Sequence, residues 1–170
     1  MQGPTQEEVE RQALAMVQAA FDHARAGETA QLADLLARGV PVDVRNGKGD
    51  SLLMLAAYHG HRETAELLLQ RRADPELRNL RNQTPLQGVA FQGNVALASL
   101  LLSHGAEVDG AGADGKTALM FAAMFDRVEV MELLLDKGAR AEHTDAAGHT
   151  AASLAAAMGA QRAAALLQSR

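Results

Sequence analysis

The sequence predicts an all-α protein made of stacked pairs of short helices, and three observations lead to this fold class. A period of 33 residues links Ser51, Thr84, Thr117 and Thr150 without an insertion. Within each period, apolar residues recur at helical intervals. The composition agrees, because 48% of the 170 residues are hydrophobic while only 3% are aromatic and Trp is absent. Such residues suit closely packed short helices rather than a β-sandwich or barrel.

The amino-terminal residues are expected to form a long helix and an atypical first unit, residues 6–45. Thr5 and Glu8 have the spacing of a capping box, which predicts a helix from near Gln6 to about Ala26. A second helix is expected over residues 30–36. The opposite side of the long helix is polar, as the end of a stack requires. Its apolar face consists of Val9, Ala13, Met16, Val17, Ala20 and Phe21.

Residues 79–111 show the repeating unit most clearly. Thr84-Pro85-Leu86 begins one helix, because a proline lacks only an N–H that the first turn does not use. Gly93-Asn94 ends that helix and caps a second one, which closes near Gly105. The same pattern predicts regular units at 46–78, 79–111 and 112–144 and a closing unit at 145–170. We expect a single domain, residues 1–170.

The repeated phrases resemble ankyrin repeats, most clearly NQTPLQGVAFQGNVALASLLLSHGAEV and GKTALMFAAMFDRVEVMELLLDKGARA. The resemblance covers nearly the whole chain and is closest in style to small stand-alone bacterial ankyrin proteins. It implies an all-α ankyrin-repeat solenoid of helix-turn-helix units with projecting finger loops. The fingers are expected at residues 40–49, 74–83, 107–116 and 141–149.

The chain departs from the family at the histidine that follows its Thr-Pro-Leu triplet. Only Thr84-Pro85-Leu86 keeps the triplet intact. The bonds that the family's histidine makes between loops are therefore not expected, and contacts of interior methionines are expected to substitute for them. The residues at the histidine position are Met54, Gln87, Met120 and Ser153.

Charge and composition exclude several classes of function. A formal net charge of −5 argues against binding to a phosphate backbone and weakly favours a basic partner surface. The absence of Cys excludes disulfides and thiolate chemistry. No apolar run approaches the length of a membrane span, and the first residues lack a signal-peptide pattern. We expect a cytoplasmic protein that binds neither nucleic acid nor a membrane.

Three patterns suggest chemistry but have simpler explanations. His59 and His61 have the spacing of a metal pair, yet no carboxylate pair lies nearby at ligand spacing. The hydroxyl residues at 51, 84, 117 and 150 all begin helices, so they are interpreted as caps and not as nucleophiles. Residues 110–115, GAGADG, lack a phosphate-binding lysine pattern and are interpreted as a turn. We expect no enzyme activity, catalytic residue, metal or cofactor.

The resemblance implies that a protein partner binds in a concave groove, through the ends of the first helices and the finger tips. Aromatic and Met side chains, which are enriched in interface cores, occur at the groove positions of successive units. The groove residues are expected to be Tyr58, His59, Phe91, Gln92, Met124, Phe125 and Met158. The finger-tip residues are expected to be Lys48, Asp50, Leu80, Arg81, Gln83, Asp114, Lys116 and His149.

The aromatic residues of the groove permit two interpretations. Tyr58, Phe91 and Phe125 either form an exposed recognition surface or are buried by neighbouring units against each other. Phe21 and Phe121 fit interior positions and are expected in the core.

The sequence therefore predicts a non-enzymatic adaptor or regulator that binds a partner protein of unknown identity. An alternative is an inhibitor of the immunity or antitoxin type, which would occlude the active site of an enzyme. We expect a monomer, with a homodimer formed through the groove as another possibility. The sequence does not distinguish the adaptor from the inhibitor.

Overall fold

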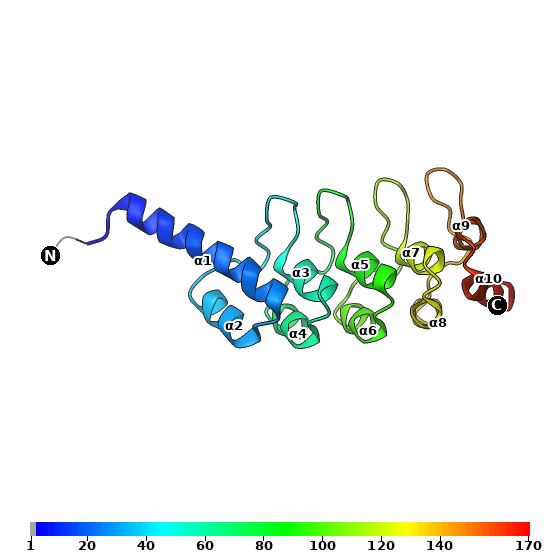
Figure 1. Cartoon of the computed structure of the whole chain (residues 1–170), viewed down its shortest axis with the longest axis horizontal. Coiled ribbons are helices and arrows are strands. Elements are labelled where there is room, and N and C mark those ends of the chain that lie inside the picture. Colours follow the sequence, from blue (N-terminus) through cyan, green and yellow to red (C-terminus); the bar gives the residue numbers. More distant parts are fainter. Residues whose placement is uncertain (1–2) are drawn as a thin grey trace. The chain divides into compact units, whose positions relative to one another are not determined.

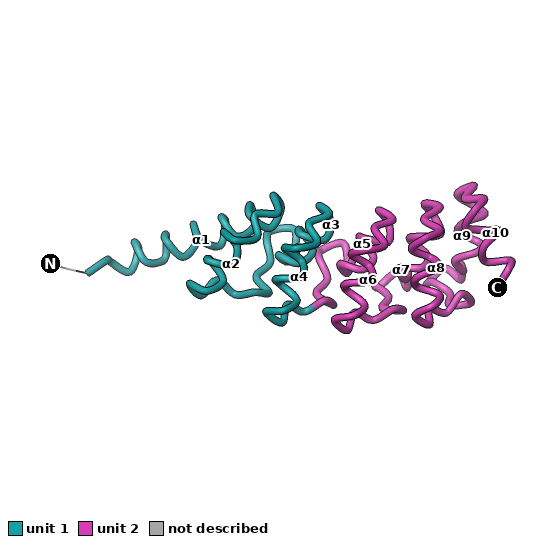
Figure 2. Tube along the Cα trace, turned by 90° about the horizontal axis from the view of Figure 1, so that it is seen from below, with its two compact units in different colours: residues 1–74 teal, residues 75–170 magenta. Residues whose placement is uncertain are grey.

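The computed structural model describes residues 3–170, which contain ten helices and no strand. This part of the chain confirms the predicted all-α fold class. The helices fall into two compact units, shown in teal and magenta in Figure 2. Unit 1 ends at Asp74 and unit 2 begins at Pro75. The single domain expected from the sequence stays a prediction.

Unit 1 contains the long first helix and three shorter ones (Figure 1). Its elements are α1 (Gln6–Ala26), α2 (Thr29–Ala37), α3 (Leu52–Tyr58) and α4 (Arg62–Gln70). Helix α1 packs against α2 and α3, and α4 packs against both of these shorter helices. A loop joins α2 to α3, and an isolated antiparallel bridge between Arg45 and Ser51 closes it into a finger.

Unit 2 contains three helix pairs that follow one another along the chain. They are α5 (Pro85–Gln92) with α6 (Val95–Ser103), α7 (Ala118–Met124) with α8 (Val128–Asp136), and α9 (Ala151–Met158) with α10 (Gln161–Gln168). Within the unit, α7 packs against both α5 and α9, and α8 packs against both α6 and α10. Each pair therefore covers the apolar side of its neighbour.

A hydroxyl begins the first helix of every pair from α3 onward. Ser51 Oγ accepts from the N–H of Met54 at 3.1 Å, and Thr84 Oγ1 accepts from the N–H of Gln87 at 3.3 Å. Thr117 and Thr150 cap α7 and α9 in the same manner. These bonds confirm the interpretation of the repeated hydroxyls as helix caps, because each satisfies a backbone donor in the first turn.

Helix α1 is buried over only part of its length. It begins with the predicted capping box between Thr5 and Glu8. Ala20, Phe21 and Ala24 are buried, which confirms the core position expected for Phe21. The first ten residues of the helix are exposed, however, including Val9 and Ala13. The apolar face predicted for this helix thus continues beyond the helices that cover it.

Carboxylates connect successive fingers at a fixed spacing. In unit 1, Asp43 Oδ1 accepts from the backbone N–H of Asp74 at 3.0 Å. In unit 2, Glu76 accepts from the N–H of Glu107 at 2.9 Å, and Asp109 accepts from the N–H of Arg140. Each acceptor lies 31 residues before its donor. A charged acceptor strengthens such a bond, so the three carboxylates fix the register between neighbouring fingers.

The side chain of Gln87 corrects an expectation about the loops. Its Nε2 donates to the carbonyl of Gly110 at 3.1 Å and to that of Lys116 at 2.9 Å. Its Oε1 accepts from the N–H of Thr84, so all its polar atoms are engaged in a buried position. The bonds between loops that were not expected after the loss of the family's histidine are therefore made here by an amide. This role of Gln87 could not be predicted from the repeat pattern, because Met occupies the equivalent positions 54 and 120.

Replacing Gln87 by Met is expected to lower the free energy of unfolding by about 1–3 kcal/mol, because two loop carbonyls and one N–H lose their partner. Met fits the site in shape, since Met54 and Met120 occupy the equivalent positions and are buried. Urea unfolding followed by circular dichroism measures the loss. The control Gln161→Met changes an exposed residue, and unchanged stability in Gln87→Met would mean that the loop bonds contribute no net stability.

Candidate functional site

The apolar residues expected in the groove of unit 2 lie at the carboxyl ends of its first helices. Phe91 and Gln92 end α5, Met124 ends α7 with Phe125 directly after it, and Met158 ends α9. Because α7 packs between α5 and α9, these ends belong to one succession of neighbouring elements. The structure thus supports their expected placement at equivalent positions of three helices.

Phe91 and Phe125 are in contact with each other and are also partly exposed. Their ring centroids lie 4.5 Å apart with an interplanar angle of 70°, an edge-to-face arrangement. Phe91 is 37% exposed and Phe125 is half-buried. The contact agrees with the packing interpretation, and the exposure of Phe91 leaves the recognition surface a prediction. The two rings pack across neighbouring helix pairs of unit 2, and the Phe91 ring is still partly exposed to solvent.

The remaining apolar groups of the surface differ in burial. Met158 is 51% exposed, whereas Met124 is half-buried. Phe121, which was expected in the core, is also only half-buried. The buried residues of α7 are instead Leu119, Met120 and three alanines, Ala118, Ala122 and Ala123. Phe121 lies one helical turn before Phe125 and adds to the partly exposed apolar area.

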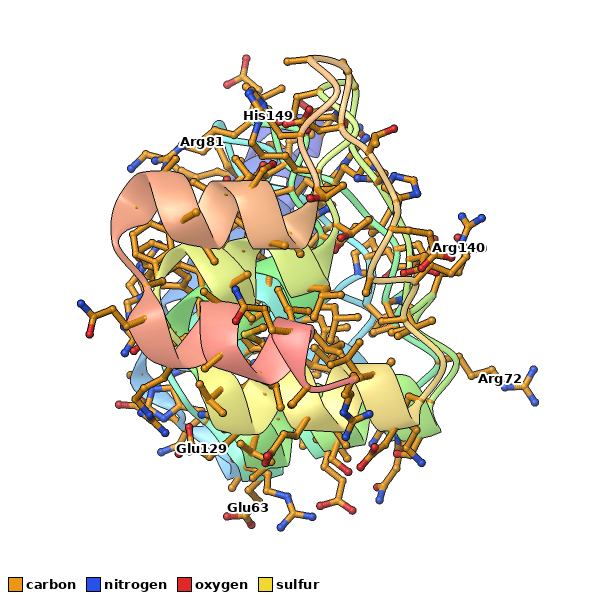
Figure 3. The ribbon with its side chains drawn as sticks, turned by 90° about the vertical axis from the view of Figure 1, so that its right-hand side faces the viewer. Glu63, Arg72, Arg81, Glu129, Arg140 and His149 are labelled. Atoms are coloured by element: carbon orange, nitrogen blue, oxygen red, sulfur yellow. The ribbon has the colours of Figure 1, made fainter. Side chains whose placement is uncertain are left out.

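The finger before α5 is held by an asparagine at its tip. Asn79 Oδ1 accepts from the N–H groups of Arg81 and Gln83, at 3.0 and 3.1 Å. This turn leaves Leu80 79% exposed and Arg81 exposed. Figure 3 shows that, within unit 2, Arg81 and His149 point to the finger-tip side of the unit, away from Arg140 and Glu129.

Lys116 and Asp114, both expected to contact a partner, also bond within unit 2, and Asp114 is exposed. Lys116 Nζ lies 3.6 Å from Asp114 Oδ2 and 3.4 Å from Asp145 Oδ2, and only 24% of its side chain is exposed. The carbonyl of Asp114 accepts from the N–H of Ala146. These contacts tie the third finger to the fourth. The buried Asp145 carboxylate on the fourth finger attracts the Lys116 ammonium group inward.

Asp145 is the centre of this network. Its Oδ1 accepts from the N–H groups of Ala147 and His149, and its Oδ2 lies 3.3 Å from His149 Nδ1. The backbone bond from His149 is the main cause that lowers the pKa of Asp145 to about 2, and burial opposes this shift. The Asp145 carboxylate therefore stays ionised and positions the fourth finger with His149 at its tip.

In unit 1, the expected contact residues lie at the end of α3 and on the first finger. Tyr58 is 48% exposed, and its ring meets that of His59 edge-on at 5.7 Å. The His59 ring stacks on His61 at 6.4 Å. Lys48 is exposed at the finger tip, and Asp50 is half-buried at its base.

His61 has a structural role at the junction of two helix pairs. Its Nε2 bonds the carbonyl of Arg25 at 2.9 Å, so the ring holds the end of α1. Arg127 makes the equivalent bond to the carbonyl of Phe91 in unit 2, at 3.0 Å. Among residues 3–170, no group of three His, Asp or Glu side chains is arranged to hold a metal ion. The described helices also include none that is both long and apolar enough to cross a membrane.

The side chains that hold the predicted finger turns were not identified in the sequence, although a signal was present. Asn46, Asn79 and Asp145 share the 33-residue register, and each accepts from the N–H groups two and four residues later. Gly112 occupies the remaining position, and there Asp114 accepts from the N–H of Lys116 instead. Asn and Asp at a repeated loop position are typical of such turns.

Comparison with known proteins agrees with this architecture. The sequence model of the family described as ankyrin repeats (3 copies) matches residues 18–111 and again residues 89–170. The chain belongs to the ankyrin repeat family. Its fold class is therefore the ankyrin-repeat solenoid that the sequence predicted. Ankyrin repeats are generally protein–protein interaction modules, and the family is generally non-enzymatic.

A curated relative supports the same family. The ankyrin repeat chain is similar to a protein of Pseudomonas aeruginosa that is described as an ankyrin repeat protein. The two are 57% identical over 47 residues, which is 28% of this chain. The matched part also spans only 28% of the length of that relative.

The network around Asp145 predicts that the thermal stability of the protein falls at low pH. Because the folded-state pKa, about 2, lies below the ordinary value of 3.8, the ionised carboxylate stabilises the fold above about pH 4. This stabilisation is lost as the pH falls from about 4 to about 2. The Tm of the protein and of the variant Asp145→Asn, measured from pH 2 to pH 7, is expected to differ most above pH 4 and to converge in acid.

Asp34→Asn is the control for that experiment, since Asp34 is exposed and pairs with Arg38 on the surface of one helix. An exposed pair of this kind contributes about 0–1 kcal/mol. A difference in Tm between the protein and Asp145→Asn that stays constant down to pH 2 would contradict the prediction.

Proposed function

We propose that this ankyrin repeat protein is a non-enzymatic adaptor or regulator that binds a partner protein through the ends of its first helices and its finger tips. The observation that carries the proposal is the partly exposed aromatic pair Phe91–Phe125, with Met158 exposed at the equivalent end of α9. Burying a partly exposed aromatic ring against a partner removes apolar area from water, which favours binding.

The geometry of the pair suits a binding anchor. Phe125 supports the Phe91 ring from the side, so the exposed ring loses little side-chain freedom when a partner covers it. The bond from Arg127 to the Phe91 carbonyl fixes the backbone at the same point. Aromatic residues held in this manner are typical of the few residues that dominate binding energy.

The polar rim of the surface is expected at the fingers. In unit 2 it comprises Leu80 and Arg81 on one finger and His149 on another, while Gln83 is half-buried at the base of its finger. Asp114, whose side chain is 58% exposed, and the less exposed Lys116 complete this proposed rim. Among the contact residues expected in unit 1, Tyr58, His59 and Lys48 are exposed.

The net charge favours a partner with a basic surface. With a formal charge of −5, long-range attraction raises the association rate with a cationic protein. Long-range repulsion lowers the association rate with nucleic acid. We further propose a cytoplasmic location. The same charge is compatible with an inhibitor that covers a basic enzyme. Such an inhibitor forms a tight complex of fixed stoichiometry with one protein, whereas an adaptor recovers several partners more weakly.

The substitution Phe91→Ala is expected to weaken binding of the partner by about 2 kcal/mol or more, which is about thirtyfold or more in Kd. Loss of the edge-to-face contact with Phe125 is expected to cost about 1 kcal/mol of stability. The partner is first recovered from native lysate with the immobilised protein. Titration of purified partner by calorimetry then gives the Kd for the protein and for Phe91→Ala, Phe125→Ala and Tyr58→Ala.

Val95→Ala is the matched control, because Val95 is 38% exposed but lies at the start of α6 and not at the end of a first helix. Thermal unfolding of each variant separates binding from folding. If the aromatic variants lose stability strongly and binding falls only in proportion, the rings are packing residues and the proposed surface is rejected.

A further inference from the structure

The outer half of α1 extends away from the rest of unit 1 (Figure 1). Residues 6–15 are all exposed, with Val9 45% and Leu14 72% accessible. At 1.5 Å per residue this segment is about 15 Å long. A capping box and the bond from Gln6 to Glu10 stabilise it locally. Unit 1 therefore presents nearly three turns of well-capped helix to solvent.

One face of this exposed segment is apolar and continuous with the core. In an α-helix successive residues turn by about 100°, so Val9, Ala13 and Val17 lie on the same face as the buried Ala20 and Ala24. Val17 and Met16 are half-buried at the point where the face leaves the unit. A face that buries apolar residues at one end and exposes them at the other is incompletely covered.

A shallow hollow of about 170 Å³ adjoins this face at the point where the helix leaves the unit. One wall is formed by Ala13, Met16 and Val17 of α1. The other is formed by Val40 and Pro41 in the loop after α2, with Arg38 at the edge. Arg38 Nη2 lies 3.7 Å from the Met16 sulfur. The hollow is mostly apolar and has one cation beside it.

We propose that the outer half of α1 pairs antiparallel with the same helix of a second copy of this chain. With Ala13 of both copies at the two-fold axis, residues at equal distances on either side of position 13 meet. Val9 of one copy then lies opposite Val17 of the other, at the hollow. A small residue at the crossing point allows the two helices to approach closely, and a two-fold interface uses the same patch on both copies.

Charge complementarity favours this antiparallel arrangement over a parallel one. The exposed first turns of α1 carry Glu7, Glu8 and Glu10. The edge of the hollow carries Arg38, which pairs with Asp34 at 3.5 Å and keeps 57% of its side chain exposed. In the antiparallel pair the acidic turns of one copy come to the height of Arg38 in the other, on both sides of the axis. A parallel pair would place the acidic turns of both copies side by side, where like charges repel.

The size of the patch predicts a weak dimer. About ten residues of helix and one hollow on each copy bury less than the roughly 1,200 Å² of a standard stable interface. Association is therefore expected in the micromolar range and to depend on concentration. The pairing uses residues of unit 1 and leaves Phe91 and Phe125 available. The proposed dimer differs from the monomer expected from the sequence. Each dimer would carry two copies of the partner-binding surface of the adaptor.

Sedimentation equilibrium from about 1 to 500 μM, around the micromolar Kd inferred here, tests the proposal by the mass of the particle. The protein is expected to approach twice the chain mass at the highest concentration. Ala13→Glu, which places two carboxylates at the axis, is expected to raise the dimer Kd by at least about tenfold. Ala15→Glu introduces the same charge on the opposite face and is expected to leave the Kd unchanged. Circular dichroism checks that both variants keep the helix.

A disulfide test locates the contact independently of mass. Because the chain contains no Cys, Ala13→Cys and Ala15→Cys each introduce a unique thiol. Mild oxidation with oxidised glutathione, which is reduced as the two thiols lose their protons and electrons, is expected to join Ala13→Cys copies at the axis. Ala15→Cys is expected to cross-link much more slowly, since its thiols are not within bonding distance. A monomer at every concentration, or equal cross-linking of both variants, would overturn the proposal.

Discussion

Every helix pair in this protein depends on its neighbour to bury its apolar side. Short helices of seven to nine residues are unstable alone in water, and α3, with six buried residues in succession, has almost no polar face of its own. The 33-residue register ensures that leucines and alanines of adjacent pairs meet. Packing between neighbouring helix pairs is thus the interaction on which the rest of the structure depends. The core of each unit forms where its helix pairs meet.

Polar bonds make this stacking specific, because apolar contact alone fixes no register. The carboxylates Asp43, Glu76 and Asp109 bind the backbone one finger later, while His61 and Arg127 bind carbonyls at the ends of preceding helices. Gln87 adds two bonds from inside a helix to a loop. All of these bonds except the one to Gly110 cross from one repeat to the next, so a shift of one residue between repeats would break them together. The aromatic pair of the proposed binding surface is positioned by the same frame.

Much of the fold could be predicted because the period is uninterrupted. The hydroxyl caps, the glycine after α5 and the first residue of α1 follow from local rules that one turn of helix is enough to decide. The roles of Lys116 and Gln87 could not be predicted in that way. Both depend on atoms more than twenty residues distant, Asp145 and the loop carbonyls, and nothing in the local sequence separates a lysine that meets a partner from one that meets a buried carboxylate. The exposure of Val9 was missed for a related reason, since helical periodicity reveals a face but not how far its covering extends.

The inward position of Lys116 affects how any scan of this surface is to be interpreted. An alanine at that position removes the cation between Asp114 and Asp145, and the two carboxylates then repel each other across adjacent fingers. Lost affinity in such a variant would therefore include the effect of displaced loops as well as any missing contact. Lys116 holds two neighbouring fingers together in addition to its expected place at the finger tip.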